Sequence, residues 1–196
     1  MVAGAIETNE FVEGRLKFKF PKHWLVEKYD AQQGFVSTEL RQLQAFKAVD
    51  FLILNANVLT LVEVKEFQGD PYPNTLDNVV VQKTRDTILG LLLAWRMKDD
   101  STNDENFTKQ YDKLKVFVEH VITPGTEIRL IFLLDSIQDG MSQLDRDDLH
   151  DLDQSISCRV KPIVAQYQLF NIDEFQKTIA DVELIGQNNC SAVVPV

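Results

Sequence analysis

Two apolar segments joined by a short polar one constrain this fold most strongly. Residues 48–54 and 59–67 are rich in Val, Ile, Leu and Phe, and residues 55–58 between them include two asparagines, which favour turns. The pattern predicts a β-hairpin whose loop is residues 55–58. Because both faces of each strand carry apolar side chains, the strands are expected to lie in the interior of a sheet.

Three charged residues interrupt this apolar hairpin. With the loop as predicted, Leu54 pairs with Leu59. Asp50 then lies opposite Glu63, and Lys65 follows on the same face. The opposite face holds Val49, Phe51, Ile53, Val62 and Val64. Two carboxylates and an ammonium are therefore expected to meet among apolar side chains, and a change of one residue in the loop would separate them.

The predicted cluster of Asp50, Glu63 and Lys65 points to metal chemistry. Buried charges are costly unless they are paired or bound to a metal, and neighbouring carboxylates repel each other, so that one pKa must rise. A divalent cation relieves that repulsion, and carboxylate oxygens suit Mg²⁺ or Mn²⁺. The metal would lower the pKa of a bound water, and Lys65 would stabilise charge developing on a phosphate. The cluster thus predicts a hydrolytic site for a phosphodiester.

The remaining patterns predict an α/β or α+β domain with a mixed sheet covered by helices on both faces. Further strands are expected at residues 16–20, 24–29, 127–134 and 166–170. Helices are expected at residues 37–43, 78–97, 107–121, 144–160 and 172–179, the last with Asn171 near its cap. Residues 1–10 and 186–196 are expected to be frayed ends.

Charge and length limit the class of protein. A chain of 196 residues favours one domain. The formal net charge of -10 disfavours a nucleic-acid binder, because phosphates repel an acidic surface. However, residues 15–28 are basic and residues 135–153 are rich in aspartate. This asymmetry permits a basic groove on an acidic body, although two solvated surface segments explain it equally well.

Nothing in the sequence predicts a membrane or secretory location. No apolar run approaches the length that spans a bilayer, and the first residues do not resemble a signal peptide. The two cysteines, Cys158 and Cys190, have no metal-binding spacing and make no disulfide framework. We therefore expect a cytoplasmic protein without a membrane partner.

The hairpin and its surroundings resemble the PD-(D/E)XK nuclease superfamily. Asp50 and a short loop precede Glu63-Val64-Lys65 within an apolar strand, followed by a long helix and a buried strand. The stretch from Lys47 to Leu52 is also similar to small bacterial proteins of this fold. The resemblance implies a restriction-endonuclease-like core over residues 37–134, inside a single domain of residues 1–196. Val49 stands where the family has proline, and the carboxylate that carries the chemistry is kept.

The resemblance also implies site residues, a cofactor and partners. It implies Mg²⁺ or Mn²⁺ bound by Asp50, Glu63 and the Val64 carbonyl, with Lys65 assisting the attacking water. Further implied site residues are Glu39 and Gln82 in the catalytic set, and Lys83 and Arg85 at the substrate. The implied substrate is DNA or RNA, hydrolysed at its phosphodiester bonds. A homodimer is a possible assembly, since many nucleases of this type pair to cut two strands.

Two other functions fit the same sequence: a non-catalytic nucleic-acid-binding module and a protein-interaction module on the same fold. Asp50, Glu63 and Lys65 would then form a structural ion-pair cluster, although it would carry an unbalanced negative charge. Glu39 would be an exposed helical residue, and Gln82 and Arg85 part of a polar stripe. A basic segment 15–28 beside the cluster would favour a nucleic-acid partner, whereas a distant one would weaken that reading.

Overall fold

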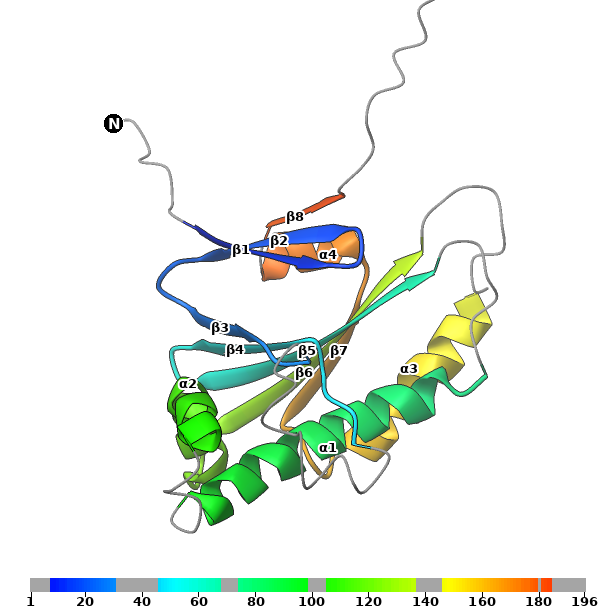
Figure 1. Cartoon of the computed structure of the whole chain (residues 1–196). Coiled ribbons are helices and arrows are strands. Elements are labelled where there is room, and N and C mark those ends of the chain that lie inside the picture. Colours follow the sequence, from blue (N-terminus) through cyan, green and yellow to red (C-terminus); the bar gives the residue numbers. More distant parts are fainter. Residues whose placement is uncertain are drawn as a thin grey trace, which may run out of the picture.

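The computed structural model describes residues 8–30, 46–67, 74–98, 105–136, 146–179 and 181–184, which form a mixed α/β structure (Figure 1). The strands are β1 (Thr8–Glu13), β2 (Leu16–Pro21), β3 (Leu25–Lys28), β4 (Phe51–Asn55), β5 (Val58–Phe67), β6 (Glu127–Ser136), β7 (Gln166–Phe170) and β8 (Asp181–Leu184). The helices are α1 (Leu76–Met97), α2 (Glu105–Ile122), α3 (Arg146–Val160) and α4 (Ile172–Thr178). Within these residues, no helix is both long enough and apolar enough to cross a bilayer.

The β4–β5 hairpin has the predicted register, with Leu54 opposite Leu59. Its loop is shorter than predicted, because Asn55 also pairs with Val58 and only Ala56 and Asn57 lie between them. Ala56 has a φ of 52°, the left-handed conformation that suits a two-residue hairpin turn. Shortening the loop at both ends keeps the register, so the alignment of the charged residues is unaffected.

The larger sheet has the order β3-β4-β5-β6-β7 and is mixed, as expected. β3, β4 and β5 pair antiparallel, whereas β5, β6 and β7 pair parallel. Parallel neighbours need long crossover connections, and α1 and α2 lie between β5 and β6 in the chain while α3 lies between β6 and β7. β5 pairs with β4 along one edge and with β6 along the other, so it is an interior strand.

The two faces of the larger sheet are covered differently (Figure 1). Helices α1, α2 and α3 pack on one face, where they bury Leu52, Leu61 and Phe132 of the sheet. A second sheet, of order β1-β2-β8, packs with α4 on the other face. Helices were predicted on both faces. On this second face α4 contributes Phe175, but a small sheet provides most of the described cover.

The second sheet corrects the predicted N-terminal end. Residues 8–10, expected to be frayed, belong to β1, because Phe11 in the same strand packs edge-on against the rings of Phe20 and Phe51. β8 was not predicted and pairs with β2. Val49 also differs from expectation, since it joins the helix-covered face. The backbone bends at Asp50, so the alternation of side chains between the two faces of β4 does not extend back to Val49. The helix predicted at residues 37–43 lies outside the described residues.

Candidate functional site

Asp50, Glu63 and Lys65 meet at one place on the helix-covered face, as the hairpin register predicts. Asp50 is 3 % exposed and accepts a 2.6 Å hydrogen bond at Oδ2 from the backbone N–H of Val64. Lys65 Nζ lies 2.5 Å from Oε1 of Glu63. The bond to Val64 fixes the Asp50 carboxylate against β5, so that its other oxygen faces α1.

Lys83 of α1 completes this cluster. Its Nζ lies 2.8 Å from Oε2 of Glu63 and 3.3 Å from Oδ1 of Asp50. The sequence placed Lys83 at the substrate, whereas here its ammonium contacts both carboxylates. The negative charge expected from Asp50, Glu63 and Lys65 alone is therefore balanced by a second lysine. Burial lowers the pKa of Lys83, but Glu63 and Asp50 outweigh that effect and hold the pKa above its usual value.

Glu63 is the most buried charge of the cluster. It is fully buried, and neither carboxylate oxygen makes a hydrogen bond of acceptable geometry, although each is in ion-pair contact with a lysine. Burial and the nearby Asp50 carboxylate raise its pKa to about 7, against the opposing effect of Lys83 and Lys65. A carboxylate with this pKa carries a proton for part of the time at neutral pH. It would be stabilised by additional positive charge.

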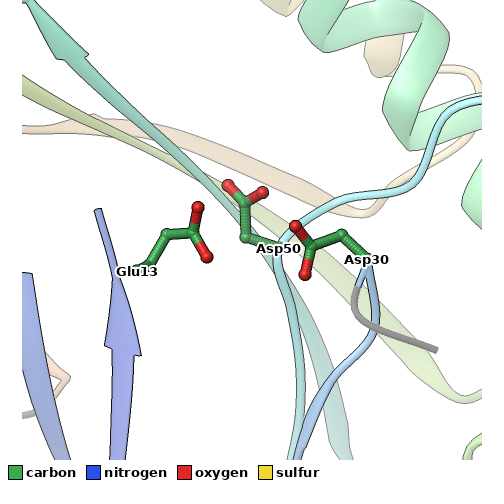
Figure 2. Close-up of side chains that lie close together, drawn as sticks. All are labelled: Glu13, Asp30 and Asp50. Atoms are coloured by element: carbon green, nitrogen blue, oxygen red, sulfur yellow. The ribbon is translucent and has the colours of Figure 1, made fainter. Parts of the chain in front are cut away.

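A second group of acids lies on the other side of Asp50. Glu13 at the end of β1 and Asp30 just after β3 approach it closely, so that one oxygen from each of the three carboxylates lies within 4.8 Å of the others. Figure 2 shows Glu13 and Asp30 on either side of Asp50, with the carboxylates turned toward one another. Burial raises the pKa of Asp30, and Asp50 and Glu13 raise it further. Asp50 thus belongs to two acidic groups.

Glu13 reaches the site because the β1–β2 turn is fastened to β5. Gly14 in this turn has a φ of 54°, which glycine adopts without strain, and a Cβ there would collide with the Glu66 carboxylate. The backbone N–H of Arg15 donates a 2.7 Å hydrogen bond to Oε1 of Glu66. Lys28 Nζ lies 2.7 Å from Oε2 of Glu13. The two ends of the basic segment 15–28 therefore lie beside the cluster, each paired with an acid.

Helix α1 holds the segment that leads into Asp50. Thr87 Oγ1 accepts a 3.0 Å hydrogen bond from the backbone N–H of Val49, and Asp86 Oδ2 accepts one of 3.2 Å from that of Lys47. Both acceptors are buried. Since every second N–H of this segment is bonded to α1, the helix determines where the chain enters β4.

The remaining predicted site residues are Arg85, Gln82 and Glu39. Arg85 has 61 % of its side chain exposed and bonds to its neighbour Asp86. Gln82 is half-buried on α1, and Glu39 lies outside the described residues. Glu13 and Asp30 were not among the predicted site residues. A weak signal existed for each, because Glu13 precedes a turn-forming glycine and Asp30 follows an extended segment directly.

The arrangement can bind a hard cation through carboxylate oxygens and present ammonium groups to an anion beside it. Comparisons of the chain with protein-family models, curated proteins and solved structures returned no match. The geometry of the cluster is therefore the main evidence for what the protein does.

Proposed function

We propose that the protein is a divalent-metal-dependent hydrolase of nucleic-acid phosphodiester bonds, on a restriction-endonuclease-like core. One observation carries the proposal: the buried Asp50 carboxylate is shared between two acidic groups. On one side it lies with Glu13 and Asp30, and on the other it contacts the same ammonium as Glu63. A group of four carboxylates, Asp50 and the three acids around it, is costly unless cations lie among them.

The donor atoms fit Mg²⁺ or Mn²⁺. Both ions take oxygen ligands, and Mg²⁺ is commonly held by one or two carboxylates together with water and substrate phosphate. Asp50 is the common ligand, with Glu63 and the Val64 carbonyl as the set implied by the resemblance. Glu13 and Asp30 form a second possible set. The buried oxygens of Glu63 support the fit, because each already contacts a cationic ammonium whose place a metal ion could take.

The chemistry divides between the cation and the lysines. A bound divalent ion would supply an activated water and polarise a phosphoryl oxygen. Lys65 has 27 % of its side chain exposed, so its ammonium lies at the boundary between the buried acids and the solvent. There it can contact a phosphate oxygen and stabilise the charge that develops on it. Lys28 and Arg15 lie on the side of β1, where Lys28 pairs with Glu13 and Arg15 with Glu66, so a phosphate there would have to compete with these acids.

The acidic surface constrains how a nucleic acid would be held. With a formal net charge of -10, general attraction to phosphates is weak. Affinity would have to come from the basic residues next to the site, and few phosphate contacts give a shallow salt dependence. We therefore propose a short contact with the strand, centred on the bond that is cleaved.

A cleavage assay on the full chain tests this function. Labelled single- and double-stranded DNA and RNA would be incubated at low salt with Mg²⁺, Mn²⁺ or a chelator. We expect cleavage of one substrate class with metal, and a loss of about 100-fold or more in Asp50→Asn and Lys65→Met. Glu10→Gln is the control, because Glu10 pairs with Lys17 on the surface of β1. Cleavage that persists in both site variants would overturn the catalytic assignment.

The contact of Lys83 with both carboxylates favours a second candidate, a non-catalytic module with a structural ion-pair cluster. With Lys65 and Lys83 against Asp50 and Glu63, this part of the site is neutral without a metal. Calorimetry separates the two candidates. A hydrolase binds Mn²⁺ at a site that Asp50→Asn removes, whereas a structural cluster binds none and loses stability when either lysine is replaced.

A further inference from the structure

We infer that Lys83 and the divalent cation compete for the same carboxylate oxygens, so that Lys83 sets the metal affinity of the site. This inference rests on the proposed function, because it assumes that a cation binds at Asp50 and Glu63. It assigns Lys83 a role that differs from the substrate contact expected from the sequence. It also identifies the oxygens for which the two cations compete.

Each carboxylate oxygen of Asp50 and Glu63 contacts a donor or an ammonium. Oδ2 of Asp50 is held by the N–H of Val64, and Oε1 of Glu63 lies against Lys65. Lys83 contacts the remaining oxygen of each carboxylate, at 3.3 Å and 2.8 Å. A metal held by both Asp50 and Glu63 would use these same remaining oxygens, because the other oxygen of each carboxylate already contacts Val64 or Lys65.

The Lys83 ammonium and a metal ion would exclude each other at these two oxygens. Mg²⁺ binds carboxylate oxygens at about 2.1 Å, so an ion joining the two oxygens would lie between them. An ammonium within contact distance of both would then stand next to a doubly charged ion in a buried environment. Repulsion between charges is strong where water is excluded. The lysine must leave for the metal to bind.

The Lys83 side chain can leave these oxygens without a movement of α1. Its ammonium ends a flexible four-carbon stem, and 15 % of its side chain is exposed, so it lies near an opening to solvent. The helix backbone is fixed separately, through Asp86 and Thr87 and through buried Val80 and Leu91. Metal binding therefore requires a rotation of one side chain rather than a change in the fold.

Two substitutions at Lys83 change the competition in opposite directions. Lys83→Met keeps the length of the stem and removes the charge, so Mn²⁺ should bind about tenfold more tightly or better. Lys83→Arg keeps the charge, and a guanidinium can hold two carboxylate oxygens at once, so Mn²⁺ should bind more weakly than to the wild type. Lys65→Met is the matched control. Among the described residues, Lys65 forms an ion pair with Glu63 only, and it is more exposed than Lys83, so its effect on affinity should be smaller.

Calorimetry with Mn²⁺ measures the dissociation constants, and thermal melting with and without Mn²⁺ provides a second readout. We expect the order of affinity Lys83→Met, wild type, Lys83→Arg, and a larger metal-induced rise in melting temperature for Lys83→Met. Tighter binding by Lys83→Arg, or weaker binding by a folded Lys83→Met, would overturn the competition while leaving the proposed function intact. If Lys83→Met does not fold, Lys83→Arg alone decides. No binding by any variant would overturn both proposals.

Discussion

The hydroxyl of Thr87 accepts a 3.0 Å hydrogen bond from the backbone N–H of Val49, the residue before Asp50. Both residues are fully buried, so water cannot replace either partner of this bond. A helix that begins after β5 thereby fixes the entry of the chain into β4. The position of the Asp50 carboxylate therefore depends on the bond between Thr87 and Val49.

Thr87→Val should destabilise the fold by about 1–3 kcal/mol, because the N–H of Val49 would remain buried without an acceptor. Thr84→Val is the control in the same helix. Thr84 is equally buried, but its hydroxyl donates to the Val80 carbonyl, which keeps its helical partner after the change. Urea unfolding measures both. Equal losses of stability would show that the bond to Val49 has no special role.

Glu13→Gln should weaken Mn²⁺ binding about tenfold if Glu13 and Asp30 share the cation with Asp50. Glu10→Gln, on the same strand, should leave the dissociation constant unchanged, because Glu10 faces Lys17 at 2.8 Å on the surface. Calorimetry on the two variants checks this. An unchanged affinity in Glu13→Gln would restrict the metal ligands to the hairpin residues.

Gly14→Ala should reduce the affinity for Mn²⁺, since its Cβ would push away the Glu66 carboxylate that bonds to Arg15 and holds the turn beside the site. Gly125→Ala is the matched change. Gly125 also has a positive φ, of 83°, but a Cβ there meets nothing within 4 Å. Both variants should lose stability, about 1–3 kcal/mol from backbone strain. Only Gly14→Ala should also lose metal affinity, and a similar loss in Gly125→Ala would argue against the link through Glu66.

Glu63→Gln should change how stability depends on pH. Folding raises the pKa of Glu63 from 4.5 to about 7 through burial and the neighbouring Asp50, with Lys83 and Lys65 opposing the rise. The folded state therefore binds the proton more tightly, and the stability from this group is present at low pH and lost as pH rises between these values.

Glutamine does not titrate, so the variant should gain stability relative to the wild type across that interval, by at most about 1.4 kcal/mol per pH unit. Urea unfolding at several pH values between 4.5 and 8, without divalent ions, measures the difference in unfolding free energy between the two proteins. A difference that does not change with pH would mean that Glu63 has an ordinary pKa in the folded protein.

The hairpin was predictable because its information is local. Apolar residues on both faces of β4 and β5 indicate interior strands, and a short loop leaves few registers that keep Asp50 and Glu63 on one face. An error of one residue at each end of the loop cancelled, since the pairing of Leu54 with Leu59 was preserved. The capping of α4 was equally local: Asn171 accepts from the N–H of Glu174 as its residue type predicts.

The acids of the second group were not predictable in the same way. Glu13 approaches Asp50 through contacts between distant segments, among them the bond from Arg15 in the β1–β2 turn to Glu66, which lies 51 residues away in the chain. The contact of Lys83 with both carboxylates was not predicted, for a related reason. The buried side of α1 includes Thr84, Asp86 and Thr87, so apolar spacing alone does not define which side faces the sheet.

The strand β2 is bordered by β1, its neighbour in sequence, and by β8, the last strand described, with Phe18 opposite Val182. During translation, β2 leaves the ribosome long before β8 is made. The edge of β2 that pairs with β8 therefore lacks this partner until β8 is made, and open edges of this kind promote association between nascent chains. The small sheet closes only when β8 has been synthesised, so the edge of β2 is the part of this sheet that a chaperone would have to protect until then.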